Sequence, residues 1–214
     1  MRDEKDDLFP EGWVDDTGTV GHDEMGDLLD QLICERDGFD LEEMRAERVV
    51  REGVREEAEA YLRLMPEKWP ALNWNWDFSA KAQRYVFDGM PPPRFTAAYP
   101  AGLRLGWVQV VPFDAKLSNF NRRNGLDELW ALGDQGKLAE AIAYIRRRHP
   151  LTPPMVAPVQ IAGGPAAREV YLVGGNHRYT VAKFSGLVDL PIYVDRKHAA
   201  EVSAIVPVRW ADEA

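Results

Sequence analysis

Apolar residues recur at helical spacing through the first third of the chain. The stretch from Asp23 to Gly38 predicts a helix, because its apolar residues fall on one side: Met25, Leu28, Leu29, Leu32 and Ile33. A longer helix is expected from Leu41 to about Leu64, with Arg and Glu on the face opposite Ala46, Val50, Val54, Ala58, Tyr61 and Met65. Residues 1–22 have no such period, and their many Gly and Asp residues predict an acidic flexible arm.

Aromatic residues and prolines dominate the next segment, from Pro66 to Gly106. Its first part contains Trp69, Trp74, Trp76 and Phe78. We expect these rings to hold the N-terminal helices to a following sheet, and an aromatic surface that stacks on a base or grips a partner is the alternative. The run "MPPPRF" predicts a rigid polyproline-like turn, and "SAKAQRYVFDG" predicts one short helix ending at Gly89.

Strand patterns and helical patterns alternate from Trp107 onward. The expected strands are "WVQVVPF", "MVAPVQIA", "REVYLVGG", "LVDLPIYVD" and "SAIVPVRW". Between them lie a polar loop, "DAKLSNFNRRNG", a short helix and a longer helix in "LDELWALGDQGKLAEAIAYIRRRHP", and a helix in "NHRYTVAKFSG". Gly163-Gly164-Pro165 predicts an antiparallel hairpin. The pattern predicts an α+β domain at residues 105–214, preceded by a helical region at residues 23–104.

Composition places the chain among globular proteins, since 45% of its residues are hydrophobic and 29% are charged. The single cysteine, Cys34, excludes an internal disulfide and a Cys-rich zinc site. The four histidines are far apart in the sequence and predict no dedicated metal site. Without an apolar run of about 20 residues or an apolar signal core, a cytoplasmic protein that does not enter membranes is expected.

Charge is unevenly distributed along the chain. Residues 1–65 carry 21 acidic and 8 basic side chains, and the remainder carries 14 acidic and 18 basic ones. The excess of basic residues after residue 65 could form a face that binds polyanions. An ordinary surface of mixed charge is the alternative interpretation. Arg146, Arg147 and Arg148 end a predicted helix, where cations suit the helix dipole. Contact with nucleic acid is the alternative role of this arginine run.

Chemistry concentrates in "YLVGGNHRYTVAKFSG", from Tyr171 to Gly186. A strand that passes through Gly174 and Gly175 into a helix exposes backbone N–H groups where the helix dipole favours an anion. Glycines also let a phosphate approach the backbone closely. Arg178 supplies a planar donor for phosphate oxygens, and His177 can donate a hydrogen bond or move a proton. The alternative is a simple turn in which Asn176 caps the helix.

The order of motifs over residues 107–209 resembles the ParB/sulfiredoxin superfamily. The matching segments read "VQVVPFDAKLSNFNRRNG", "PPMVAPVQI", "VYLVGGNHRYTVAKFSG" and "LPIYVD". The resemblance implies a ParB/sulfiredoxin-like mixed sheet with helices and a phosphate-binding loop at Gly174–Arg178. The sulfiredoxin branch carries G-G-C-H-R, and this chain has Asn176 at the cysteine position. An amide cannot form the covalent sulfur intermediate, so the resemblance does not extend to sulfinic acid reduction.

Two other branches suggest different chemistry. The chromosome-partitioning branch binds CTP and holds DNA through a following helix-turn-helix domain, and no such DNA-reading part is expected after the last strand of this sequence. A branch of small kinases phosphorylates free serine, with an acidic loop residue as general base. Asp114 occupies the corresponding loop and is expected to act with His177 as a catalytic residue, although it could equally be a turn former.

The resemblance assigns further nucleotide contacts to the polar loop, at Lys116, Ser118, Asn121 and Arg122, with Arg122 favoured over Arg123. On the helix after the motif, Thr180 is close enough to reach a phosphate or its metal. Val181, Ala182 and Phe184 are expected to face the core, whereas Thr180 and Lys183 are expected to face solvent.

These features predict a protein that binds ATP or CTP with Mg²⁺ and hydrolyses the nucleotide or transfers its phosphoryl group. It would act as an NTPase or as a kinase with a small-molecule hydroxyl acceptor. A DNA-associated adaptor regulated by nucleotide is the alternative, and a ParB-like nuclease ranks third because no carboxylate cluster for two metal ions is visible. A homodimer is left open.

Overall fold

The protein has an α+β fold. The structure is a computed structural model that describes residues 22–87, 89–131, 135–159 and 167–213. The chain divides into two compact units, Met1–Val50 and Arg51–Ala214. None of the helices in the described ranges combines the length and hydrophobicity needed to cross a bilayer.

Two helices make up the described part of the first unit, α1 (His22–Asp37) and α2 (Leu41–Ala58), and α2 continues into the second unit. Gly38 adopts a φ of 72°, a left-handed conformation that glycine allows, and ends α1. The Cys34 thiol lies 3.3 Å from the Met44 sulfur, and the Arg48 guanidinium donates to the Gly26 carbonyl at 3.0 Å. The two helices therefore pack on each other. The second helix is shorter than predicted, because a 3₁₀ turn follows Ala58.

The second unit contains a five-stranded mixed sheet in the order β3-β2-β4-β1-β5. The strands are β1 (Leu103–Gln109), β2 (Met155–Pro158), β3 (Val170–Gly174), β4 (Asp189–Asp195) and β5 (Arg209–Trp210). β2 runs parallel to β4, and the other pairs are antiparallel. The expected pairing of β2 with β3 is confirmed, whereas the predicted turn at Gly163-Gly164-Pro165 lies outside the described residues.

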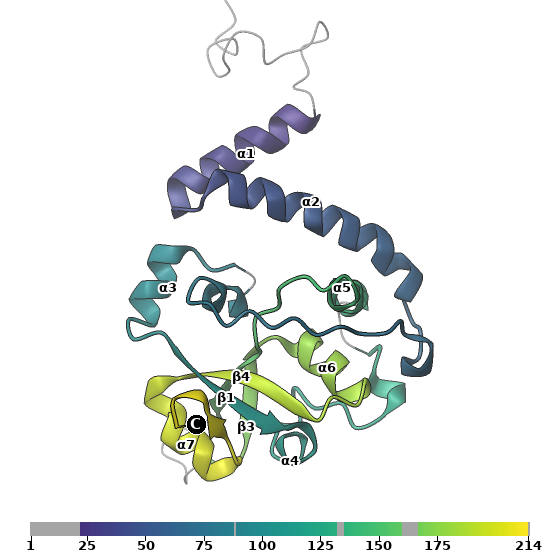
Figure 1. Ribbon diagram of the computed structural model, residues 1–214, viewed down its shortest axis with the longest axis vertical. Helices are drawn as coiled ribbons and strands as arrows, with labels where there is room; N and C mark the ends of the chain where they lie inside the picture. Colours follow the sequence, from purple (N-terminus) through teal and green to yellow (C-terminus); the bar gives the residue numbers. More distant parts are fainter. Residues whose placement is uncertain (1–21, 88, 132–134, 160–166, 214) are drawn as a thin grey trace, which may run out of the picture. The chain divides into compact units, whose positions relative to one another are not determined.

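Helices surround this sheet (Figure 1). The α-helices are α3 (Pro92–Ala98), α4 (Val110–Asp114), α5 (Gln135–Arg146), α6 (Asn176–Phe184) and α7 (Ala199–Ile205). The short 3₁₀ helices are η1 (Glu59–Tyr61), η2 (Pro66–Lys68), η3 (Ala82–Phe87), η4 (Leu126–Glu128), η5 (Arg196–His198) and η6 (Ala211–Glu213).

Three segments differ from their predicted structure. The first strand ends at Gln109, and "VVPFD" forms α4 instead of extending it. Within "SAIVPVRW", the first residues end α7 and only Arg209–Trp210 is a strand. In the first of these segments a β-branched residue lies in a helix because its burial decides the conformation, as for Val110. The second continues the helix that buries Val202, one residue before the segment begins.

The proline run was also predicted incorrectly. Instead of continuing a polyproline-like turn, the chain enters α3 with Pro91 as its N-cap and Pro92 as its first residue. Proline suits the first helical position, since its missing N–H would have no helical partner there. The expected helix in "SAKAQRYVFDG" is present only as the 3₁₀ helix η3.

Both faces of the sheet are covered. Along β4, Leu190, Ile192 and Val194 pack in one cluster with residues of α4, α6 and α7. Tyr193, which points to the opposite face, packs with residues of η3 and α3. α5 lies beside α6 and adds a further cluster that contains Val181 (Figure 1). The motif helix is consequently held on two sides by buried apolar side chains.

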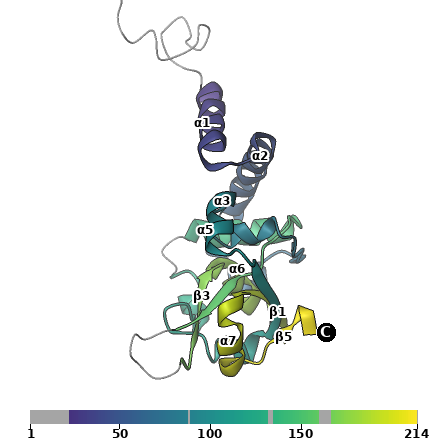
Figure 2. The same ribbon diagram turned by 90° about the vertical axis from the view of Figure 1, so that its left-hand side faces the viewer.

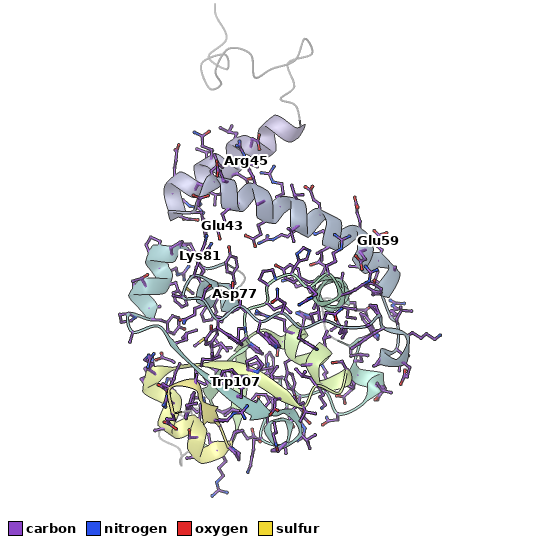
Figure 3. All side chains as sticks on the ribbon, in the orientation of Figure 1. Glu43, Arg45, Glu59, Asp77, Lys81 and Trp107 are labelled. Atoms are coloured by element: carbon purple, nitrogen blue, oxygen red, sulfur yellow. The ribbon has the colours of Figure 1, made fainter. Side chains whose placement is uncertain are left out.

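The aromatic segment packs onto this second unit. Trp74 and Trp76 stack with ring centroids 5.0 Å apart, and both contact the core clusters of the sheet and of α5. The Trp69 indole N–H donates to the Leu64 carbonyl at 3.0 Å. Phe78 meets Trp107 of β1, labelled in Figure 3, edge to face at 5.8 Å. The compact unit thus begins at Arg51, which differs from the predicted domain boundary near residue 104.

Basic residues at the end of α5 form ion pairs within the unit. The Glu57 carboxylate lies 2.6 Å from the Arg146 guanidinium and 2.5 Å from that of Arg147. Burial opposes ionisation of Glu57, but hydrogen bonds from Tyr61, Arg147 and Arg146 outweigh it and lower the pKa of this carboxyl. These ion pairs give Arg146 and Arg147 a structural role.

The C-terminal elements are fastened to the first strand. β5 lies beside β1 (Figure 2), and the Arg104 guanidinium on β1 lies 4.3 Å from the ring centroid of Trp210. The same guanidinium donates to the Asp212 carboxylate at 2.7 Å and to the Glu213 carboxylate at 2.6 Å. These contacts hold β5 and the residues after it against β1.

Candidate functional site

The N-terminus of α6 is the centre of the predicted site. Gly175 precedes the helix with a φ of 87°, and neither a side-chain cap nor an acidic residue in the first turn is present among the described residues. The first N–H groups of a helix have no intrahelical acceptor, and they carry the positive end of the helix dipole. His177 is half-buried in this first turn. The start of α6 therefore favours a negatively charged group.

The two glycines serve the fold as well. A Cβ on Gly174 would lie 1.9 Å from the backbone carbonyl oxygen of Val86, and one on Gly175 would lie 2.9 Å from Pro154. The space that the missing side chains leave is therefore occupied by η3 and by the segment before β2. Close approach of a phosphate was the predicted reason for these glycines, and close approach of the protein's own backbone is the reason that the structure supplies.

A buried asparagine joins the polar loop to the motif. Asn121 is only 4% exposed, and its amide donates to the Asn176 side-chain oxygen at 2.8 Å. Its own oxygen accepts from the backbone N–H of Leu172 at 2.9 Å. Asn121 thus connects the loop after α4 with both β3 and the first residue of α6. Of the predicted loop contacts, this is the one with a hydrogen bond to the motif in the described residues.

The other loop positions lie farther from the motif. Lys116 and Ser118 pair through their backbones with Val170, at the start of β3. Val170 precedes Gly174 by four residues, which is roughly 13 Å along a strand. The Lys116 side chain is exposed there, and the Ser118 carbonyl closes the turn that contains Asn121. The structure therefore does not bring Lys116 or Ser118 to the start of α6.

Arg178 points into the protein. Its guanidinium donates to the Thr152 carbonyl at 2.5 Å and approaches the Tyr85 carbonyl at 3.5 Å. These acceptors belong to the segment before β2 and to η3, which flank the motif. Arg178 was predicted to hold phosphate, and its hydrogen bonds to these two carbonyls make it a tie between three segments of the chain.

Asp114, the predicted general base, is held in a cluster of polar side chains. The carboxylate is 16% exposed, and one oxygen accepts from the Tyr179 hydroxyl and from the Lys183 ammonium, the latter at 2.8 Å. The other oxygen lies 3.6 Å from the Arg122 Nε. Burial, then the hydrogen bond to Asp114, raises the pKa of Tyr179 far above its ordinary value, so this phenol stays protonated. Asp114 is not an isolated base, because it has three partners.

Thr180 and Lys183 were wrongly predicted to face solvent. Thr180 is 2% exposed, and its hydroxyl donates to the Asn176 carbonyl one turn earlier at 2.8 Å. The hydroxyl is therefore engaged by the helix. Lys183 turns inward to Asp114 and also donates to the Arg123 carbonyl. Asn176, Tyr179 and Lys183 share one helix face at i, i+3 and i+7, a spacing that could have revealed Lys183.

Two neighbouring arginines complete the cluster. The Nε atoms of Arg122 and Arg123 are buried and have no hydrogen-bond partner among the described residues. Arg122 and Lys183 both face the single carboxylate of Asp114. Within the polar loop, Lys116, Arg122 and Arg123 outnumber this one carboxylate, and the excess of positive charge suits a polyanion.

No group of three or more His, Cys, Asp or Glu side chains in the described ranges is arranged to hold a metal ion. Mg²⁺ is usually bound by one or two carboxylates together with substrate phosphates. Asp114, the nearest carboxylate, is already held by Lys183, Tyr179 and Arg122. A magnesium ion at this site would accordingly be carried by the phosphates of its nucleotide.

Replacing Asp114 by Asn is expected to destabilise the protein by about 1–2 kcal/mol. The amide keeps an acceptor for Tyr179, but Lys183 and the arginines lose their counter-charge. Urea unfolding followed by circular dichroism measures the change. Asp189→Asn, at an exposed carboxylate that starts β4, is the matched control and should have no such effect. Equal stability of the two variants would show that the Asp114 cluster does not stabilise the fold.

Comparison with known proteins gave no further assignment. No family model matches this chain, and no curated protein or solved structure matches it either.

Proposed function

We propose that the protein binds a nucleoside triphosphate, ATP or CTP, at the N-terminus of α6, in the cytoplasm. One observation carries the proposal: the Asn121–Asn176 hydrogen bond, which brings a positively charged loop against a helix start that has no side-chain cap. Both sides of such a site would contribute, the helix through its N–H groups and His177, and the loop through Arg122 and Arg123.

A bound triphosphate would be hydrolysed or would lose its terminal phosphoryl group to a small-molecule hydroxyl acceptor. Phosphoryl transfer depends mainly on positioning and on charge stabilisation. Mg²⁺ bound to the phosphates supplies part of that charge stabilisation. Asp114 is the carboxylate that would accept the proton of the attacking hydroxyl. One of its oxygens already accepts from Tyr179 and Lys183, so the other oxygen, 3.6 Å from the Arg122 Nε, is the one that would take that proton.

The DNA-associated alternative gains no support from the arginine run, because Glu57 holds Arg146 and Arg147. Salt-sensitive retention on DNA would revive it.

His177→Ala is the sharpest test of nucleotide binding. Isothermal titration of ATP and of CTP, each with Mg²⁺, should give a Kd about tenfold higher for the variant, as expected for one lost charge-assisted hydrogen bond. Before this, a thermal-shift screen identifies the nucleotide. A ligand at about 100 times its Kd should add about 2.7 kcal/mol of stability.

His198→Ala, in η5, is the matched control, since this histidine lies outside the motif and faces Glu201 at 3.7 Å. Binding by the control should equal that of the wild type. The proposal is refuted if the wild-type protein binds neither nucleotide, or if His177→Ala binds as tightly as the wild type.

A further inference from the structure

A groove of about 510 Å³ lies at the other end of the motif helix. Its walls come from the segment Pro66–Trp74 and from Phe184–Leu187, where α6 ends. Nine residues separate Asn176 from Ser185, which is roughly 14 Å along a helix. None of the residues assigned to the nucleotide lines this groove, so it forms a separate site that does not depend on the proposed function.

Seven of the ten residues that line the groove are aromatic or aliphatic, although polar atoms make up the larger part of its exposed surface. Trp69, Trp74 and Phe184 contribute rings, and two prolines and two leucines contribute the remaining apolar surface. The indole N–H of Trp69 is already bonded to the Leu64 carbonyl, so this ring offers the groove no N–H donor. Trp74 stacks on Trp76, which fixes its orientation. These walls combine a few apolar rings with polar surface, as a site for a small polar or charged molecule requires.

Charge in the groove has one sign. Glu67 is exposed and lines the groove, and none of the described lining residues is cationic. The C-terminal end of α6, at Phe184–Leu187, adds the negative end of a helix dipole. The faces of indole and phenyl rings are negative as well and attract cations. Three independent features of the groove therefore favour a positive charge.

We propose that this groove binds a small organic cation, with an ammonium or guanidinium group over the tryptophan rings and beside Glu67. The volume supports a small molecule, since ligand sites commonly enclose about 300–1,000 Å³ and combine apolar walls with a few polar groups. Two lysines are neighbours of the lining residues: Lys68, which is exposed and stands between Glu67 and Trp69 in the chain, and Lys183, whose ammonium is 5.7 Å from the centroid of Phe184. Lys183 is committed to Asp114 and the Arg123 carbonyl, so Trp69 and Trp74 are the rings that bind the ligand.

Choline and its uncharged isostere, 3,3-dimethyl-1-butanol, provide a direct test, because they have nearly the same shape and differ in charge. Titration of the full chain, followed by tryptophan fluorescence or calorimetry, should give a Kd for choline about tenfold lower than for the alcohol. Glu67→Gln should raise the choline Kd about threefold, and Glu67→Lys should raise it about tenfold.

Glu59→Lys is the matched control. Glu59, labelled in Figure 3, is an exposed glutamate of η1 that does not line the groove, and its replacement should leave the choline Kd unchanged. The test therefore changes only the charge of an exposed side chain and leaves the tryptophans of the groove in place. The proposal is overturned if choline does not bind, if the uncharged alcohol binds equally well, or if Glu67→Lys binds choline as the wild type does.

Discussion

Gly174→Ala is expected to be the most damaging single-methyl substitution near the motif, with a loss of about 3 kcal/mol or more of unfolding free energy. The added Cβ would lie 1.9 Å from the Val86 carbonyl oxygen and 3.0 Å from the carbonyl carbon. Both are backbone atoms, and Val86 is 1% exposed inside a core cluster, so no flexible side chain can yield. Overpacking of this kind commonly costs 1–3 kcal/mol, and the cost rises when the backbone must move.

The same substitution at Gly186 provides the comparison. That glycine has a φ of 76°, and a Cβ there would meet nothing within 4 Å. Gly186→Ala should therefore cost only the strain of a left-handed residue, about 1–2 kcal/mol. Chemical denaturation of both variants measures the difference. If the two substitutions cost the same, η3 does not lie against β3 as the structure has it.

Arg178→Ala should destabilise the protein by about 2–3 kcal/mol, whether or not nucleotide is present. The variant leaves the Thr152 carbonyl, and more weakly the Tyr85 carbonyl, without the donor that holds them. Hydrogen bonds to charged groups contribute about 1.5–3 kcal/mol, and an acceptor left unsatisfied in a buried place adds to the loss. For a chain of this size, each kcal/mol lowers the melting temperature by about 2–4 °C.

Arg178→Lys separates the structural role from phosphate binding. Lysine keeps the charge but has one ammonium where arginine has a planar fork, so it should recover part of the stability. If Arg178 instead acts mainly as a phosphate ligand, Arg178→Ala would lose nucleotide binding and keep the melting temperature of the wild type. Measuring both quantities on the same preparations distinguishes the two roles.

These two substitutions bear on the candidate site in the same way. Gly174 and Arg178 flank His177 and fix the segments around it, η3 and the residues before β2. A loss of nucleotide binding that comes with a lower melting temperature in either variant would therefore reflect a displaced helix start. His177→Ala is the better test of nucleotide binding, because it leaves the contacts of Gly174 with Val86 and of Arg178 with Thr152 unchanged.

Periodicity predicted most elements because apolar residues recur on one side of each, although in α1 Leu29 and Leu32 on that side are exposed. The helix α1 and the motif helix α6 match their predicted ranges within about two residues, and the antiparallel pair β2 and β3 was expected from the strands on either side of a turn. Prediction was wrong where burial overrode local preference. Val110 and Val111 favour a strand as single residues, but Val110 is buried in α4 and ends the strand early.

The candidate site was only partly predictable. Asn121 could be named as a loop contact, but its two hydrogen-bond partners lie 51 and 55 residues away, and no local pattern encodes such a meeting. The glycines and Arg178 were assigned to phosphate because the protein's own carbonyls, at Val86 and Thr152, cannot be foreseen from the chain alone. Carbonyl oxygens accept hydrogen bonds, as phosphate oxygens do, so the same residues can serve either partner.

The sequence by itself determined the α+β class, the order of the main elements and the position of the motif between a strand and a helix. These follow from side-chain periodicity and from glycine, which act within a few residues. Only the tertiary structure decided what the motif's side chains touch: Asp114 with Tyr179 and Lys183, and Arg178 with two carbonyls. Hydrogen bonds and ion pairs act over a few ångströms in space, so their partners are known only once distant segments have packed together.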